Sequence, residues 1–366
     1  MRLGLIGHPV SHSWSPGLFA RFSERDGIPA RYDLFPMPDV SVLRAFLREN
    51  PDIVGLNVTI PHKTAVLSLC DALHPSAARV GAANTLLIRS CGGTQGEVHI
   101  TGYNTDVGGF SAALCRFFSL ATPVREAGVR DADVRDADVR ESSLIRGENL
   151  KGRRALILGS GGSARAVAWA LRDLGISFDL VGRAKNGEAD SKVLTHAMVQ
   201  SSGMQGLSQQ GTSPEGTSPE GTSPQGTSPE GTSSQGTSPQ GASQEGAFPQ
   251  SEDAFAGARR FTYDALDSVP WEGYDLLVHC TPLGMEPAFA GQRVPVVLSY
   301  CRPSTLLFDL VYTPETTPLM QFALDCGLQV CGGIGMLEQQ AEEAWTIWKS
   351  ATDAECDTNE SSISSS

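Results

Sequence analysis

Two side chains in the first part of the chain have the types and the setting needed for proton transfer. Lys63 ends the segment Asn57-Val-Thr-Ile-Pro-His-Lys63, where a predicted strand gives way to a predicted helix. A lysine at a helix N-terminus is opposed by the helix dipole, so a functional role would explain its presence there. The alternative is an ordinary surface lysine. Asp106 ends a similar segment, Ile100-Thr-Gly-Tyr-Asn-Thr-Asp106, and is a candidate ion-pair partner. A desolvated lysine held by a carboxylate can give a proton to a reacting oxygen.

Further polar side chains that could hold a ligand lie beside predicted strands. Asn57 and Thr59 precede Lys63, and Gly81-Ala-Ala-Asn-Thr places Asn84 and a threonine before another strand. Strand-to-turn segments of this kind often present ligand groups.

The loop at residues 7–16 follows a predicted first strand at 3–6 and is unusually rich in polar side chains. Four hydroxyl or imidazole groups fall within residues 11–16. The alternative to a binding loop is a polar turn that ends in a helix cap, with Ser15 as the N-cap and Pro16 at the first helical position. Trp14 is expected to pack rather than to bind.

A glycine-rich turn at residues 159–162 is the strongest sign of a cofactor site. An apolar run of strand length ends at Gly159, and an alanine-rich helical pattern continues to Leu171. Without Cβ atoms at Gly159, Gly161 and Gly162, backbone N–H groups and a helix N-terminus can approach a diphosphate. The alternative is a turn with a purely structural role.

A second predicted strand, at residues 178–183, follows about 20 residues later, as it does in dinucleotide folds. Its end carries Arg183, with Lys185 close behind. An acidic residue there would bind the ribose hydroxyl of NAD, whereas an arginine suits the 2′-phosphate of NADP. The sequence therefore predicts NADP as the cofactor.

Length and charge limit the classes of function. The 366 residues suggest two domains, and 28 basic against 41 acidic residues give a net charge of −13. Much of the acidic excess lies in residues 186–255 and 351–366, so the folded body is close to neutral. Nucleic acids and membrane surfaces attract basic faces, and neither is expected as a partner. A small-molecule substrate fits better.

Eight cysteines are scattered without C-x-x-C pairs or Cys/His clusters, which predicts reduced thiols and no metal site. The N-terminus lacks the pattern of a signal peptide, and no apolar run approaches the ~18 residues of a spanning helix. We expect a cytoplasmic protein that is a monomer or a homodimer.

The chain divides by composition into folded and low-complexity parts. Residues 1–110 alternate short apolar runs with amphipathic stretches, as an α/β domain would. Residues 111–150 hold a charged five-residue repeat and are expected to be a linker. Residues 151–334 are expected to form a Rossmann domain interrupted by a disordered insert at 202–255, whose Gly-Thr-Ser-Pro repeats offer almost nothing to bury. A final amphipathic helix is expected at 335–350, followed by a disordered tail at 351–366.

Eight motifs, in order along the chain, closely resemble those of the shikimate dehydrogenases. Besides the glycine turn at 159–162, they are Gly7-x-Pro-x-x-His-Ser13-x-Ser15-Pro, Asn57-Val-Thr-x-Pro-x-Lys63, Gly81-Ala-x-Asn84-Thr-Leu, Gly102-x-Asn-Thr-Asp106-x-x-Gly-Phe110, Asp275-Leu-Leu-Val-His-Cys-Thr281-Pro-x-Gly-Met285, Asp309-x-Val-Tyr312-x-Pro-x-x-Thr-Pro318-Leu and Gly333-x-x-Met336-Leu-x-x-Gln340-Ala. The resemblance covers the chain apart from its two insertions. Two departures are Gly182-Arg183-Ala184 in place of Asn-Arg-Thr, and His62 in place of a phenylalanine.

The resemblance implies a role for each matching residue. Lys63 and Asp106 would be the catalytic pair. The residues implied to hold the carboxylate and hydroxyls of shikimate are Ser13, Ser15, Thr59, Lys63, Asn84, Asp106, Tyr312 and Gln340. The implied cofactor-binding residues are Gly159, Ser160, Gly161, Gly162, Ser163, Arg183, Lys185, Thr281, Leu310, Gly333 and Met336, with Met336 against the nicotinamide.

The implied fold is an N-terminal α/β substrate-binding domain, completed by the last helix, that faces a C-terminal Rossmann NADP-binding domain across a cleft. The implied reaction is the reversible, NADPH-dependent reduction of 3-dehydroshikimate to shikimate in aromatic amino acid biosynthesis. Two alternatives stay open: a dehydrogenase that also accepts quinate, and a nucleotide-binding regulator that has lost catalysis. The presence of both Lys63 and Asp106 speaks against the regulator, because a pure binder needs neither.

Overall fold

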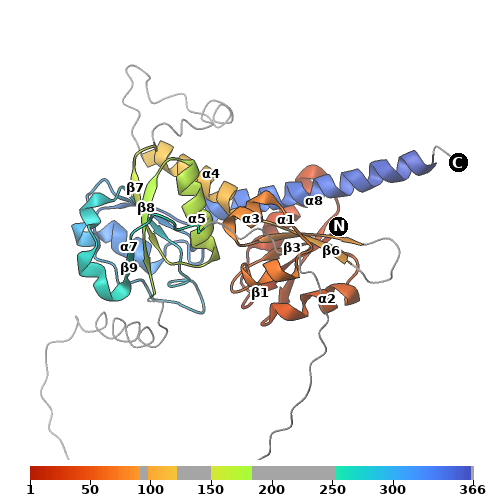
Figure 1. Ribbon diagram of the computed structural model, residues 1–366, viewed down its shortest axis with the longest axis horizontal. Helices are drawn as coiled ribbons and strands as arrows, with labels where there is room; N and C mark the ends of the chain where they lie inside the picture. Colours follow the sequence, from red (N-terminus) through yellow and green to blue (C-terminus); the bar gives the residue numbers. More distant parts are fainter. Residues whose placement is uncertain (91–97, 122–149, 184–252, 364–366) are drawn as a thin grey trace, which may run out of the picture.

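The structure is a computed structural model that describes residues 1–90, 98–121, 150–183 and 253–363. Its described part forms two α/β domains, with helices α4 and α8 running between them (Figure 1). The predicted five-residue repeat, Lys185 and most of the predicted insert lie outside the described residues. No helix in the described ranges is both long and apolar enough to cross a membrane.

The first domain is built on a mixed six-stranded sheet in the order β2-β1-β3-β5-β6-β4. Its strands are β1 Arg2–Gly7, β2 Arg31–Pro36, β3 Ile53–Val58, β4 Ala72–Leu73, β5 Thr85–Ser90 and β6 Val98–Tyr103. Strands β1, β2 and β3 run parallel, and β5 is antiparallel to both β3 and β6. Strand β1 is buried almost throughout, which explains its continuous apolar sequence.

Three α-helices and two short 3-10 helices connect these strands. They are α1 Ser15–Asp26, α2 Leu43–Glu49, α3 Pro75–Val80, η1 Val40–Val42 and η2 Ala65–Leu69. The predicted N-cap role of Ser15 is wrong, because Trp14 occupies the cap position, and the Trp14 side chain makes no capping hydrogen bond. Ser15 is already helical and buried, and its backbone N–H donates to Ser13 Oγ at 3.2 Å.

The second domain has a fully parallel six-stranded sheet in the order β12-β11-β10-β7-β8-β9. Its strands are β7 Arg154–Leu158, β8 Ser177–Gly182, β9 Arg260–Thr262, β10 Leu276–His279, β11 Leu306–Asp309 and β12 Gln329–Cys331. The helices are α5 Gly162–Asp173, α7 Pro318–Asp325 and the 3-10 helices η4 Tyr263–Ser268, η5 Trp271–Gly273 and η6 Leu298–Tyr300. After β7 the chain adds β8 and β9 on one side of this strand, and then β10, β11 and β12 on the other side. The switch point, where such folds bind ligands, therefore lies between β7 and β10.

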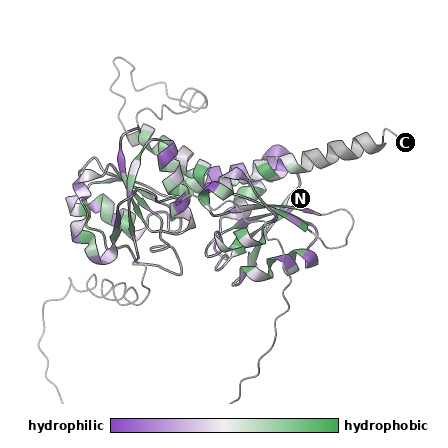
Figure 2. Cartoon of the chain, in the orientation of Figure 1, coloured by the Kyte–Doolittle hydropathy of each residue, from purple (hydrophilic) through white to green (hydrophobic). Residues whose placement is uncertain are grey.

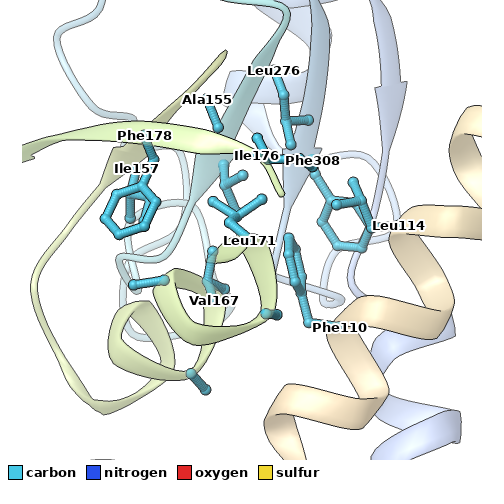
Figure 3. Packing of buried hydrophobic residues seen from close by; sticks show 14 of the residues in the cluster. Phe110, Leu114, Ala155, Ile157, Val167, Leu171, Ile176, Phe178, Leu276 and Phe308 are labelled. Carbon is cyan, nitrogen blue, oxygen red and sulfur yellow. The ribbon is translucent and has the colours of Figure 1, made fainter. Parts of the chain in front are cut away.

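Helix α4, Asp106–Ala121, corrects the predicted start of the linker at residue 111. Its apolar residues Phe110, Leu114 and Phe117 recur at helical spacing and pack into the core of the second domain. Figure 3 shows Phe110 and Leu114 directed toward Phe308 of β11. The burial of this apolar face keeps the chain helical beyond residue 111.

Helix α8, Ile334–Ile363, begins in the second domain and ends beyond the first. Its buried residues Trp345 and Trp348 share a core with Leu3, Phe19 and Leu87 of the first domain. The predicted disordered tail at 351–366 is wrong as far as residue 363, because no proline or glycine follows Gly335 to end the helix. Figure 2 shows hydrophobic residues on the strands of both sheets and on the helices between the domains.

The predicted end of the low-complexity insert at residue 255 also needs correction. Ala254 and Phe255 are buried in the core of the second domain. Asp253 accepts the backbone N–H of Phe255 at 3.0 Å and pairs with Arg260 on β9. The aromatic ring of Phe255 supplies the apolar surface that the repeats before it lack, so folded structure resumes by residue 253.

Candidate active site

A buried ion pair joins Lys63 and Asp106. Lys63 Nζ lies 2.7 Å from Asp106 Oδ2, and the two side chains are only 15% and 4% exposed. Asp106 is the first residue of α4, where the positive end of the helix dipole favours a carboxylate. The segment after Lys63 is the five-residue 3-10 helix η2 rather than an α-helix. The predicted opposition between Lys63 and the dipole of an α-helix is therefore wrong. Asp106 is the observed reason for the position of Lys63.

A hydrogen-bonded amide network fixes this carboxylate. Asn84 Nδ2 donates to Asp106 Oδ1 at 2.9 Å, while Asn84 Oδ1 accepts the backbone N–H of Thr105 at 2.8 Å. Gln340 of α8 joins the same group, because its Oε1 accepts from Asn84 Nδ2 at 3.0 Å. Residues that are distant in sequence thus meet within one polar cluster around the ion pair.

The serine loop forms a second polar group that includes both domains. Ser13 and Ser15 hold their hydroxyl oxygens 3.1 Å apart. Tyr312, which follows β11 of the second domain, lies beside Ser13, and burial raises the pKa of its phenol. The ring of Trp14 meets Tyr312 edge to face at 6.0 Å, although Trp14 is 45% exposed. Trp14 therefore packs, but at the surface.

Tyr32 belongs to this group and was missed in the sequence. Its hydroxyl lies beside Ser15 and donates to Asn57 Oδ1 at 2.8 Å, and burial raises the pKa of this hydroxyl well above its usual value. Nothing in the strand Arg-Tyr-Asp-Leu-Phe-Pro marks this residue, because its neighbours come from other segments. Thr59 lies beside the same loop, since its backbone N–H donates to Ile6 O at 3.0 Å.

The glycine turn after β7 faces the ion pair. Gly159 has φ of +116°, and a Cβ there would stand 3.0 Å from Thr281 Cγ2. A Cβ on Gly162 would lie 3.2 Å from Lys63 Cβ, so the missing side chain lets the two domains approach. Ser163, predicted as a cofactor ligand, has its hydroxyl 3.3 Å from Lys63 Nζ. Ser160 and Gly161 complete the turn that leads into α5, and a Cβ on Gly161 would meet open space.

The remaining predicted cofactor residues lie near the carboxyl ends of the second sheet. Arg183 follows β8, is exposed, and forms no ion pair with any carboxylate of the described residues. Gly333 lets its own backbone pass close to the backbone of Leu310, because a Cβ on Gly333 would clash with the carbonyl oxygen of Leu310. Met336 is buried in the core beside α4. The glycine turn, the α5 N-terminus and an exposed arginine fit a phosphorylated dinucleotide.

Comparison with known proteins agrees with this arrangement. The family model described as "Shikimate dehydrogenase substrate binding domain" matches residues 5–86. A curated shikimate dehydrogenase (NADP(+)) from Acidiphilium cryptum is 30% identical over 359 residues, which cover 95% of this chain and 90% of the relative. The chain belongs to the shikimate dehydrogenase family.

Solved structures of this family share the fold. A shikimate 5-dehydrogenase from Thermus thermophilus, in complex with NADP(H) and shikimate, matches with a TM-score of 0.58 and 25% identity, covering 95% of this chain and 93% of that one. A second curated relative, a shikimate dehydrogenase (NADP(+)) from Symbiobacterium thermophilum, is 29% identical to this chain. The aligned part covers 94% of this chain and 88% of the relative.

One departure from the usual shikimate dehydrogenase pattern has a structural explanation. His62 is 4% exposed, and its Nε2 lies 2.6 Å from the carbonyl oxygen of Met37. The imidazole thus ties the segment before Lys63 to the loop after β2. Among the described residues, no group of three or more His, Cys, Asp or Glu side chains could hold a metal ion.

Glu343 is a second carboxyl near Asp106, one turn of α8 beyond Gln340. Its Oε2 lies 2.5 Å from where a Cβ on Gly108 would stand, in the first turn of α4. Loss of hydration, and then the charge of Asp106, raise the pKa of Glu343 to about 7, although the residue as a whole is exposed. No sequence motif indicated this residue.

We expect Glu343→Gln to stabilise the protein at pH 8. A raised pKa means that the folded chain binds a proton between pH 4.5 and 7 that the unfolded chain has released, so this residue costs stability as pH rises through that window. Removing the charge should raise the free energy of unfolding at pH 8 by about 1 kcal/mol. This is less than the full pKa shift implies, because solvent screens an accessible carboxylate. Below pH 4.5 the two proteins should unfold alike. Thermal unfolding at pH 4 and pH 8 measures both.

Glu342→Gln is the matched control. Glu342 pairs with Arg25 at 2.8 Å on the surface, so its neutralisation should not stabilise the protein. An equal gain in stability from both variants would mean that the effect comes from the protein's net charge and not from the surroundings of Glu343.

Proposed function

We propose that this chain reduces 3-dehydroshikimate to shikimate with NADPH, reversibly, and that the Lys63 and Asp106 pair carries the proton transfer. The observation that supports this most is the buried ion pair facing the glycine turn of the second domain. A pure nucleotide binder has no use for such a pair. The family assignment supplies the substrate, and the local chemistry supplies the roles.

Each side chain has a task that follows from its position. NADPH, when bound, supplies the hydride to the ketone carbon. The Lys63 ammonium donates a proton to the ketone oxygen and recovers one from water. Asp106 holds the ammonium in place, and Asn84 holds Asp106. Because the pair is buried, its charges act through a less screening medium than water.

The serine loop is suited to the substrate's carboxylate and hydroxyl groups. Ser13, Ser15 and Tyr312 bring hydroxyls from both domains to one place, and each hydroxyl can donate as well as accept. Thr59 and Gln340 extend this surface toward Lys63. We infer that a ligand bound here is held by both domains at once.

A coupled assay tests the function directly. Shikimate with NADP should give rapid NADPH formation, NAD should give much less, and quinate with either cofactor should give little. Comparable rates with quinate would favour a dehydrogenase of dual specificity. NADP binding without turnover of either substrate would favour the regulator.

Arg183→Ala should weaken NADP binding by about 1.5 to 3 kcal/mol, or roughly 10- to 150-fold, and leave NAD almost unaffected. Arg183 is exposed at the end of β8, where a dinucleotide fold places the adenine ribose. Lys185 lies outside the described residues, and we propose that it adds a second positive charge. Fluorescence titration with both cofactors gives the two dissociation constants.

Arg48→Ala makes the same charge change on α2 of the first domain and should alter neither constant. Equal losses of NADP and NAD affinity in Arg183→Ala would contradict recognition of the 2′-phosphate.

We further propose a cytoplasmic location and a monomer or homodimer. The six cysteines whose side chains are described are all free thiols, as expected for a reducing compartment. Burial raises the pKa of Cys70 to about 12 and that of Cys331 to about 11, so these thiols stay protonated and unreactive near neutral pH.

A further inference from the structure

A buried His279 and Asp309 pair lies at the carboxyl ends of β10 and β11, next to the switch point. The two residues are partners in the strand register, and both side chains are fully buried. His279 Nδ1 lies 2.8 Å from Asp309 Oδ1. Asp309 also accepts the Thr317 hydroxyl at 2.6 Å on its other oxygen and the backbone N–H of Val311 at 3.0 Å.

The other imidazole nitrogen reaches the ligand side of the sheet. His279 Nε2 hydrogen-bonds Thr281 Oγ1, and the same oxygen accepts the backbone N–H of Leu283 at 3.3 Å. Thr281 lies against the glycine turn, because its Cγ2 would be 3.0 Å from a Cβ on Gly159. A chain of hydrogen bonds therefore runs from the cap of α7, at Thr317, to Thr281, whose methyl group meets the dinucleotide turn.

The order of donors and acceptors follows from the chemistry of the groups. An ionised Asp309 can only accept, so Nδ1 of the neutral ring carries the proton and Nε2 is left as an acceptor. Thr281 then donates its hydroxyl proton to His279 and accepts from Leu283. Its hydroxyl keeps one lone pair free and cannot turn a proton toward a ligand.

We propose that His279 is a positioning residue that, oriented by Asp309, locks the Thr281 hydroxyl as a hydrogen-bond acceptor for NADP. This inference rests on the proposed function. An acceptor suits a ribose hydroxyl or a carboxamide N–H of the dinucleotide, whereas it would repel a phosphate oxygen. Thr281 thus contacts a neutral donor of the cofactor, and the α5 N-terminus is left to bind the diphosphate.

Three variants separate this role from simple stabilisation of the core. Asparagine at position 279 can still donate to Asp309 but is too short to reach Thr281, so His279→Asn removes the contact that matters. Thr281→Val removes the hydroxyl itself and leaves the His279 and Asp309 pair intact. Thr317→Val is the matched control, because it takes a partner from Asp309 on the side away from the dinucleotide turn.

The dissociation constant for NADP and the midpoint of thermal unfolding are measured for each variant. His279→Asn and Thr281→Val should each raise the dissociation constant about 2- to 10-fold, the range for one hydrogen bond. The double variant should bind no more weakly than Thr281→Val alone, because His279 acts through Thr281. Thr317→Val should lower the midpoint without changing the dissociation constant.

The outcomes distinguish this inference from the proposed function. A wild-type protein that fails to bind NADP would overturn both. Wild-type binding with an unchanged constant in His279→Asn or in Thr281→Val would overturn only the inference. Additive losses in the double variant would show that His279 acts by another route and would overturn it as well. Should His279→Asn fail to fold, the Thr281→Val and Thr317→Val comparison still decides whether the hydroxyl is an NADP contact.

Discussion

Replacing Lys63 with alanine should lower kcat by about 10²- to 10⁴-fold and change the KM for shikimate far less. The variant loses the group placed to transfer the proton, while Ser13, Ser15 and Gln340 stay to bind the substrate. The Lys63 side chain is only 15% exposed, and its ammonium is held 2.7 Å from Asp106, so bulk water has limited access to replace it. Steady-state kinetics with shikimate and NADP separates the two constants.

Two further lysine variants sharpen this test. Lys63→Arg should not restore the rate, because a guanidinium does not release its proton near neutral pH. Lys349→Ala removes a lysine that pairs with Asp26 on the surface of α8 and should leave kcat unchanged. A strongly raised KM at unchanged kcat in Lys63→Ala would make Lys63 a binding group. The proton would then come most simply from a bound water.

Trp348→Ala should reduce the free energy of unfolding by about 3 to 5 kcal/mol, the usual range for a buried tryptophan. The side chain is 1% exposed, its Nε1 donates to the carbonyl oxygen of Leu86 at 2.9 Å, and its ring packs against Phe19. The indole also occupies the space over Gly55, where a Cβ would come within 2.3 Å of Nε1. Urea unfolding followed by circular dichroism measures the change.

Trp14→Ala is the control of the same residue type. Trp14 is 45% exposed, so its removal should cost less than about 1 kcal/mol. A similar small loss in Trp348→Ala would show that α8 docks on the first domain without contributing to its stability.

Local patterns were enough to predict the elements that hold the site. The apolar run before Gly159 and the alanine-rich stretch after it gave a strand, a turn and a helix, as β7 and α5 show. The ion pair of Lys63 and Asp106 was also predicted, although for a reason the structure does not support. Short-range periodicity and turn chemistry carry that much information.

The predictions that failed depended on contacts between distant segments. Ser15 has the right type for a cap, but it is buried beside Tyr32 instead. The helix through residue 121 is held by Phe308, which comes almost 200 residues later than Phe110. Glu343 owes its raised pKa first to loss of hydration and then to the charge of Asp106 on another helix. The spacing of residues along the sequence does not indicate which distant residues come into contact, so only the folded structure reveals these pairs.

The return of α8 to the first domain also sets the order in which the protein can fold during synthesis. The partners of Phe19 in that core include Trp345 and Trp348, which emerge from the ribosome only after every strand of the second sheet. Domains usually fold from the N-terminus as they are made. Here the core around Phe19 can be completed only when translation reaches α8, so its apolar residues are expected to stay exposed to aggregation or to chaperones until then. The second domain, whose strands are consecutive between Arg154 and Cys331, can close first.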